Sequence, residues 1–128
     1  MTHDSERAQA RGEPVPPRET PWGGAQRVER IAEGIWFVST ASHGGFWLAP
    51  YRRAEIPDAL VAATILKTAE WFEEDVDWAI PALLFADDMR ANPTAGEPDP
   101  EATLARARDI LGHFKPSALA RIDTGESA

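Results

Sequence analysis

Aromatic, aliphatic and β-branched residues concentrate in residues 34–49. Strand-forming runs at residues 35–39 and 46–49 flank the pair Gly44–Gly45. This pattern predicts a β-hairpin, with the two glycines supplying the positive φ angles of a tight turn. Pairing around that turn places His43 opposite Phe46. Residues 26–32, which carry Val28 and Ile31, form a weaker strand candidate.

Both faces of the predicted hairpin are substantially apolar. One face carries Ile35, Phe37, Ser39, Ala41, His43, Phe46 and Leu48, and the other carries Trp36, Val38, Thr40, Ser42, Trp47 and Ala49. A sheet with one solvated face does not need this pattern. Either helices cover both faces, or Trp36 and Trp47 form an exposed aromatic patch that binds a partner.

After Pro50 the apolar spacing changes to three and four residues, which predicts helices. One period runs from Pro57 to Phe72 and continues to Leu84, and Pro81 requires a kink or a new helix start. Residues 91–100 read as a loop. The last helix begins after Asp99, a good N-cap that is followed by Pro100. The predicted class is α+β: a small antiparallel sheet with a β-hairpin, packed by about three helices.

The domain organisation follows from length and from the apolar content of the ends. A chain of 128 residues accommodates one domain. Residues 1–19 are rich in proline and nearly free of large aliphatic side chains, so we expect a flexible arm. We expect a single domain over residues 20–116, and a frayed C-terminal tail over residues 117–128.

Composition excludes several functional classes. The chain has no cysteine, which excludes disulfides, thiolate metal sites and cysteine nucleophiles. No apolar run reaches the ~18–20 residues of a membrane span, and the first thirty residues lack the apolar core of a signal peptide. We therefore expect a cytoplasmic protein that does not bind membranes.

The net negative charge comes from the middle of the chain. The net charge is −8, and residues 54–101 hold 12 acidic side chains against two basic ones, Lys67 and Arg90. Direct binding to nucleic acid is disfavoured, because contact with the phosphate backbone needs a basic patch. The expected partner is a protein with a basic, nucleic-acid-binding surface. The sequence does not predict an oligomeric state.

The densest acidic block comprises Glu70, Glu73, Glu74, Asp75 and Asp77. On a continuous helix four of these side chains would share one side and repel one another. Three interpretations remain open: first-turn acids that complement a helix dipole, a docking face for a basic partner, or a metal or catalytic carboxylate set. The candidate partner-binding residues are Glu70, Glu73, Glu74, Asp75 and Asp77, together with Trp36 and Trp47.

Among the three histidines, His43 is the strongest catalytic candidate. With Glu74 or Asp77 across the fold it could act in general acid–base catalysis. Ser42 is adjacent to His43 in the predicted strand and so points to the opposite face, which is poor geometry for a Ser–His pair. No metal-binding motif or phosphate loop is present, so no cofactor and no metal are predicted.

Two sequence blocks carry a resemblance to a known family. The blocks STASHGG at residues 39–45 and WFEEDVDWA at residues 71–79 resemble an uncharacterised domain family of small proteins from bacterial plasmids and phages. The resemblance covers roughly residues 20–86. Relatives often carry Cys in place of Val76 and an apolar residue in place of Pro81. The family has no activity to transfer, but it implies a mobile-element context.

The leading functional hypothesis is therefore a non-catalytic acidic protein-binding module. By analogy with small acidic phage and plasmid proteins, we expect a counter-defence inhibitor of the anti-CRISPR or anti-restriction type. One alternative is a small enzyme that uses His43 with a carboxylate of residues 73–77. The other is an accessory domain with no chemistry.

Overall fold

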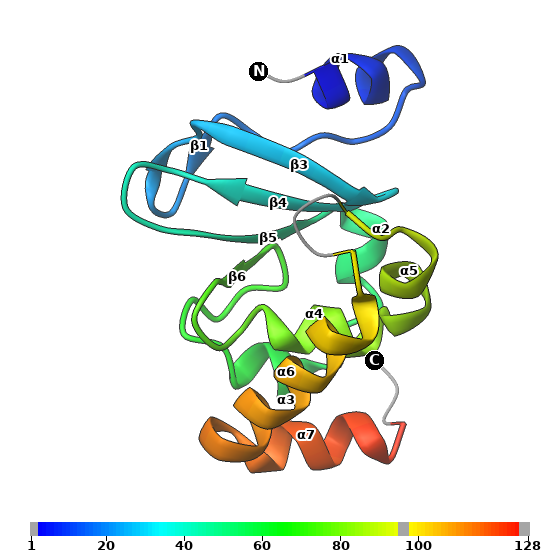
Figure 1. Ribbon diagram of the computed structural model, residues 1–128. Coiled ribbons are helices and arrows are strands. Elements are labelled where there is room, and N and C mark those ends of the chain that lie inside the picture. The colour runs from blue at the N-terminus through cyan, green and yellow to red at the C-terminus, as the bar shows by residue number, and fades with distance from the viewer. Residues whose placement is uncertain (1–2, 95–97, 126–128) are drawn as a thin grey trace.

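A computed structural model describes residues 3–94 and 98–125 (Figure 1). The strands are β1 (Glu19–Thr20), β2 (Gly23–Gly24), β3 (Arg27–Ala32), β4 (Ile35–Ser39), β5 (Gly44–Leu48) and β6 (Trp71–Glu73). The helices are α1 (His3–Ala10), α2 (Pro50–Arg53), α3 (Asp58–Ala62), α4 (Ala79–Leu84), α5 (Ala86–Ala91), α6 (Pro100–Phe114) and α7 (Pro116–Asp123). The α+β class predicted from the sequence is confirmed.

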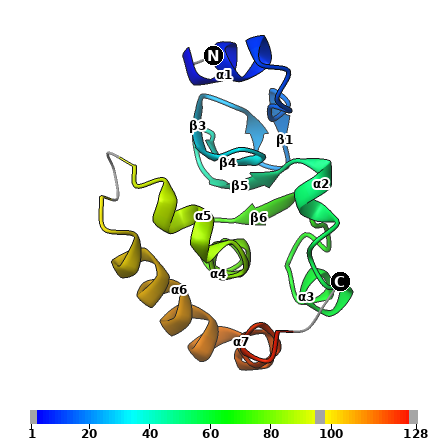
Figure 2. The same ribbon diagram turned by 90° about the vertical axis from the view of Figure 1, so that its right-hand side faces the viewer.

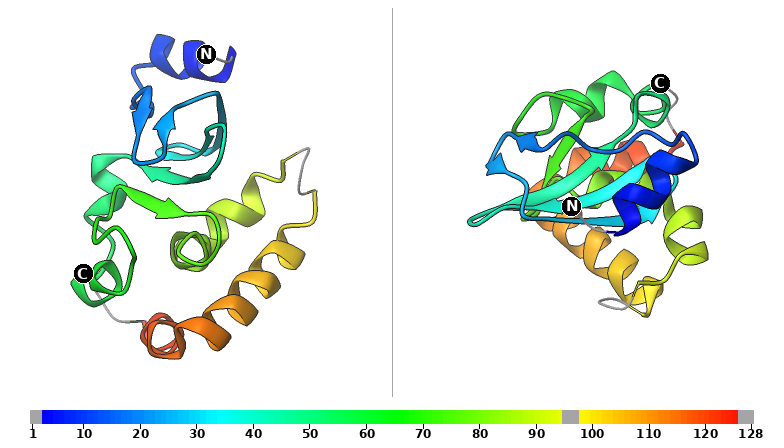
Figure 3. Two further views of the ribbon diagram at one scale, coloured as in Figure 1. Left: turned by 90° about the vertical axis from the view of Figure 1, so that its left-hand side faces the viewer. Right: turned by 90° about the horizontal axis from the view of Figure 1, so that it is seen from above.

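The main sheet has the order β3-β4-β5-β6, and every neighbouring pair is antiparallel. Helix α1 lies on one side of this sheet, and α4, α6 and α7 lie on the other (Figures 1, 2 and 3). Strands β1 and β2 form a separate two-stranded sheet beside it. The weak strand candidate at residues 26–32 is confirmed as β3.

Each face of the sheet has its own apolar cluster, so the prediction of two covered faces is confirmed. Ile35, Phe46 and Leu48 face the helices, whereas Trp36 and Trp47 face the N-terminal segment. The alternative of an exposed aromatic patch is wrong, because Trp36 is 0% exposed and Trp47 is 3% exposed.

The hairpin turn lies elsewhere than predicted. Ser39 pairs with Gly44 and Val38 with Gly45, so both glycines belong to β5 and residues 40–43 form the connection. Neither glycine has a positive φ. Gly45 is required for a different reason: a Cβ there would lie 2.2 Å from the Phe72 carbonyl oxygen and 2.6 Å from the Trp22 ring. His43 consequently lies in the connection and does not face Phe46.

Thr40 organises this four-residue connection with its own side chain. The Thr40 hydroxyl donates to the His43 carbonyl oxygen (2.9 Å) and accepts from the His43 amide (3.2 Å). The Thr40 amide also donates to the His43 carbonyl oxygen (2.7 Å). These local bonds replace the tight glycine turn, as threonine commonly does in short loops.

The long helix predicted from Pro57 to Phe72 is wrong. Helix α3 ends at Ala62, and Trp71 and Phe72 belong to β6, where they pair with Trp47 and Phe46. Cross-strand pairing of these aromatic side chains outweighs the helical spacing of the sequence. The interruption expected at Pro81 is confirmed: α4 starts at Ala79, which places the proline in the first turn, where its missing N–H costs little.

The N-terminal segment packs on the sheet, contrary to the expectation of a flexible arm. Ala8 is 0% exposed and Val15 packs against the Trp36 cluster. Arg30 also donates two hydrogen bonds to the Glu13 carboxylate, at 2.9 and 3.2 Å. The expectation that residues 1–19 contact no core is therefore corrected. Whether residues 20–116 fold alone stays a prediction.

The C-terminal elements agree in part with expectation. The Asp99 side chain accepts from the Glu101 amide (3.1 Å) and caps α6 as predicted. The segment expected to fray contains α7, whose Ala118 is 3% exposed, while residues 126–128 lie outside the described residues. The predicted 91–100 loop begins after Ala91, and its residues 95–97 are also outside the described part. Within residues 3–94 and 98–125, the helices are all too short or too polar to cross a bilayer.

Candidate binding groove and the acidic loop

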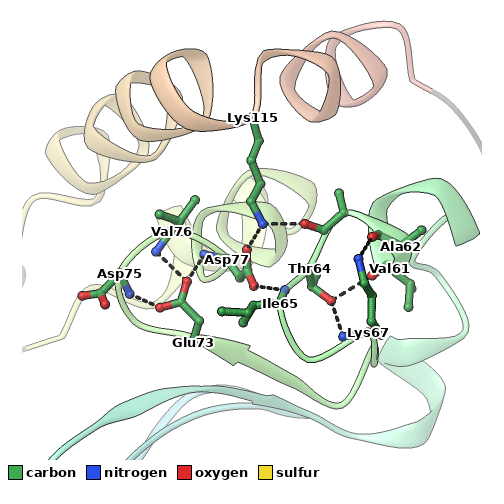
Figure 4. Close-up of polar contacts among 11 residues, drawn as sticks. Val61, Ala62, Thr64, Ile65, Lys67, Glu73, Asp75, Val76, Asp77 and Lys115 are labelled. Atoms are coloured by element: carbon green, nitrogen blue, oxygen red, sulfur yellow. Dashed lines mark hydrogen bonds and ion pairs between the residues drawn. The ribbon is translucent and has the colours of Figure 1, made fainter.

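The acidic block folds as the end of a strand followed by a turn, so the helical arrangement of its carboxylates does not occur. The Glu73 carboxylate accepts from the amides of Asp75 (2.7 Å), Val76 (2.8 Å) and Asp77 (2.8 Å). Three amides on one carboxylate fix the turn that leads into α4 (Figure 4). Glu73 therefore has a structural role, close to the helix-start interpretation of the acidic block.

Asp77 is buried and joins three parts of the chain. Its side chain is 1% exposed and accepts from Lys115 Nζ (2.5 Å) and from the Ile65 amide (2.7 Å). Lys115, at the junction of α6 and α7, also donates to the carbonyl oxygen of Ala63 (Figure 4). We call Asp77, Lys115 and the residue 63–65 backbone the buried clamp.

A turn after α3 presents the Ile65 amide to Asp77. The hydroxyl of Thr64, which is 1% exposed, donates to the Val61 carbonyl oxygen (2.8 Å) and accepts from the Lys67 amide (3.0 Å). Lys67 takes the left-handed φ of 56° that closes this turn. Neither Thr64 nor Lys115 was a candidate from the sequence. The partners of Lys115 lie 38 and 52 residues away along the chain, and those of Thr64 are local backbone groups that no motif marks.

Glu70 and the two tryptophans named as partner-binding candidates also have internal contacts. The Trp47 indole N–H donates to Glu70 Oε2 (3.1 Å), and the same oxygen lies 3.3 Å from an Arg53 nitrogen. The Arg53 guanidinium lies 5.6 Å from the centroid of the Trp47 ring. Trp36, Trp47 and Asp77 are thus buried, and Glu70 is partly engaged, which leaves Glu74 and Asp75 as the exposed members of the set.

Glu74 and Asp75, which we call the acidic loop, border a groove of about 580 Å³ between the sheet and α5–α6. Neither side chain has an ion-pair partner among the described residues. The groove is lined mainly by apolar side chains: Ile31, Phe37, Phe46, Trp78, Met89 and Ile110. Such a volume falls within the range of about 300–1,000 Å³ that is typical of ligand pockets.

The sheet wall of the groove is a cross-strand row. Glu29 of β3 pairs with Phe37 of β4, which pairs with Phe46 of β5. The rings of Phe37 and Phe46 pack edge to face with centroids 5.8 Å apart, and Phe46 packs on Trp78 at 6.4 Å. A carboxylate thus stands at one end of an aromatic row, and the acidic loop stands beside it.

Helix α6 forms the opposite wall with Thr103, Arg106 and Ile110. The Arg106 guanidinium lies 5.3 Å from the centroid of the Trp78 ring, a cation–π distance. The Thr103 hydroxyl is buried and has no hydrogen-bond partner in the described structure. Sequence reasoning missed Glu29, Thr103 and Arg106, although an acid on the core-facing side of β3 was an available signal.

His43 lies apart from the groove, in the exposed connection between β4 and β5. Glu74 comes near, since its Oε2 is 3.2 Å from where a Cβ on Gly44 would be. Within residues 3–94 and 98–125, however, no hydrogen bond or ion pair joins His43 to Glu74 or Asp77. The same part of the chain holds no group of three or more His, Cys, Asp or Glu side chains arranged to hold a metal. The geometry gives the catalytic hypothesis no supporting contact.

Fold and groove together describe a small α+β protein with a mixed aromatic and acidic binding groove. The chain belongs to the DUF7007 family, a domain of unknown function, and the match spans residues 15–127. Helix α1 precedes the matched region. No curated protein and no solved structure matches the chain.

Proposed function

We propose that this protein is a non-catalytic binding module whose acidic loop docks on a basic surface of a protein partner. The observation that carries the proposal is the exposure of Glu74 and Asp75 without an internal counter-ion in the described residues, beside a largely apolar groove. In contrast, Glu73 and Asp77 are held by internal hydrogen bonds. Glu70 also has internal partners, Trp47 and Arg53, so the acidic block divides into three carboxylates with internal contacts and two that face outward.

Charge and shape support a protein partner. Exposed carboxylates attract a basic surface over about a Debye length, which speeds association and selects against acidic partners. The apolar wall of the groove adds the hydrophobic contact that specific protein interfaces have at their centre. The overall charge of −8 opposes binding to nucleic acid itself.

Within this class, we propose a mobile-element counter-defence inhibitor of the anti-CRISPR or anti-restriction type, acting in the bacterial cytoplasm. Its partner would be a defence protein whose nucleic-acid-binding surface is covered by the acidic loop. Support comes from the negative charge and from the resemblance of the STASHGG and WFEEDVDWA blocks to plasmid and phage proteins. DNA or RNA should then compete with this protein for the partner.

The proposal is tested by charge reversal at the acidic loop. The wild-type protein is used to isolate its partner from bacterial lysate, and affinity for the purified partner is then measured at about 0.05 and 0.15 M salt. Glu74→Lys/Asp75→Lys should lose at least tenfold in affinity. The matched control Glu55→Lys/Asp109→Lys reverses two exposed acids away from the groove and changes net charge equally.

The control should lose less than threefold, and wild-type affinity should fall as salt rises. Excess DNA or RNA should displace the wild-type protein from its partner. Equal effects of the two double variants would show that net charge alone drives binding. Unchanged affinity in Glu74→Lys/Asp75→Lys would refute the proposed function.

A further inference from the structure

The groove continues along the outer edge of β3. A second cavity of about 390 Å³ shares Glu29, Ile31, Asn92, Pro93 and Thr94 with the first and adds Arg30 and Ala91. Strand β3 is the terminal strand of its sheet and pairs only with β4 in the described structure. The backbone of an edge strand offers unpaired N–H and C=O groups to an added strand. The second cavity therefore borders this edge strand at residues 29–31, directly beside the groove.

The charges around the groove favour a cationic occupant. Among the described residues that line it are three carboxylates, those of Glu29, Glu74 and Asp75, and one cation, Arg106. The Arg106 guanidinium lies over Trp78 on the α6 wall, which leaves the carboxylates on the sheet side as the groups that an incoming Lys or Arg would meet. The aromatic row of Phe37 and Phe46 suits an apolar side chain inserted between those carboxylates.

We infer that the groove binds an extended segment of the protein partner, which adds alongside β3 and inserts a large apolar side chain flanked by Lys or Arg. This inference rests on the proposed function and specifies how the partner is held. Backbone pairing with β3 gives affinity, and the groove selects the inserted side chain.

A substitution that fills the groove tests this inference separately from the role of the acidic loop. Thr103→Trp places an indole in the groove and leaves every carboxylate intact. Ala102→Trp is the matched control, because Ala102 is the exposed neighbour on the same helix and does not line the groove. Glu29→Lys is a second groove variant, which changes charge at the sheet wall while Glu29 makes no ion pair among the described residues. Thermal unfolding of all variants identifies any that fail to fold.

The probe is a displayed library of random twelve-residue peptides selected against the full chain. We expect enriched peptides that combine one large apolar residue with Lys or Arg a few residues away. A synthetic copy of the best peptide should bind at least tenfold more weakly to Thr103→Trp and to Glu29→Lys, and within twofold of wild type to Ala102→Trp. N-methylation of its backbone amides should also weaken binding at least tenfold.

Several results would overturn the inference. They are the absence of any enriched peptide, a consensus without basic residues, or equal binding to wild type and Thr103→Trp. A dimer in sedimentation that Thr103→Trp abolishes would make a second copy of this chain the occupant instead. If Thr103→Trp keeps full affinity for the partner while Glu74→Lys/Asp75→Lys loses it, the groove inference fails and the proposed function stands.

Discussion

Lys115→Met should destabilise the protein far more than an ordinary lysine substitution does, because it removes the cation of the buried clamp. Asp77 is 1% exposed, so its carboxylate cannot regain solvent when Lys115 Nζ, 2.5 Å away, is lost. Removing one member of a buried ion pair typically costs about 3–5 kcal/mol. The Lys115 side chain keeps 24% of its surface exposed, so we expect a loss of stability just below this scale, about 2–3 kcal/mol.

Replacing the acidic member of the pair should lower the stability less. In Asp77→Asn the side-chain oxygen can still accept from the Ile65 amide, and Lys115 keeps the Ala63 carbonyl oxygen and access to solvent. The loss should be about 1–2 kcal/mol, the scale of one charged hydrogen bond. The double variant should cost clearly less than the two single losses combined, because the uncompensated charge is gone.

Urea unfolding followed by tryptophan fluorescence measures these differences as shifts of the midpoint at constant slope. Lys67→Met is the matched control, since Lys67 is exposed and, among the described residues, its Nζ donates only to the Ala62 carbonyl oxygen, at 2.5 Å. That change should cost less than about 1 kcal/mol. Two results would refute the reasoning. One is a double variant whose loss of stability equals the sum of the Asp77→Asn and Lys115→Met losses, and the other is a Lys115→Met loss no larger than that of Lys67→Met.

Two further predictions concern the other face of the sheet. Gly45→Ala should destabilise the protein by about 1–3 kcal/mol, because the added Cβ clashes with the Phe72 carbonyl oxygen. Gly112→Ala on α6, where a Cβ has room, should be neutral or stabilise by up to about 1 kcal/mol. Chemical unfolding of both variants tests whether the close approach of the backbone causes the loss at Gly45. Deleting residues 1–18 should lower the melting temperature at pH 7, and an unchanged value would show that this segment contributes nothing. The hydrogen bond from Arg30 lowers the pKa of Glu13. The stability that Glu13 contributes is therefore complete above its ordinary pKa of 4.5 and is lost as pH falls through the lowered pKa of the folded state. The difference in melting temperature between the full-length and truncated proteins should narrow as pH falls below 4.5.

The faces of the hairpin could be predicted, but its turn could not. The predicted and observed registers differ by an even number of residues, and a strand's side chains alternate with period two. Ile35 and Phe46 therefore share the helix side in both, and Trp36 and Trp47 share the other. The glycines were interpreted as turn residues because the groups that would clash with a Cβ are visible only in the folded sheet: the Phe72 carbonyl oxygen at Gly45 and the Val38 carbonyl oxygen at Gly44.

Local spacing also misled the prediction for residues 57–78. Val61, Ile65 and Phe72 fit a helical period, yet Thr64 closes a turn and β6 pairs with β5. A three-residue strand has too little sequence signal to compete with such a period. The N-terminal segment was missed for a related reason: the fully buried Ala8 is small, so a search for large aliphatic residues passes over it.

The exposed half of the candidate site, Glu74 and Asp75, was accessible to sequence reasoning because charge density marks it. The facing wall was not, since Thr103 and Arg106 reach the groove only through the packing of α6. Glu29 lies between these cases. Its position in β3 is on the same face as Ile31, and a carboxylate among core-facing residues signals either an ion pair or an opening.

The division of the acidic block also changes what a charge-reversal experiment means. Glu73 holds three backbone amides and Asp77 holds Lys115, so reversing either one should lower stability whether or not the protein binds anything. A variant that changes them together with Glu74 would confuse folding with docking. Because the same turn carries the acidic loop, the carboxylates that stabilise the fold also fix the direction in which Glu74 and Asp75 face. Changes confined to Glu74 and Asp75 are therefore the ones that report on binding.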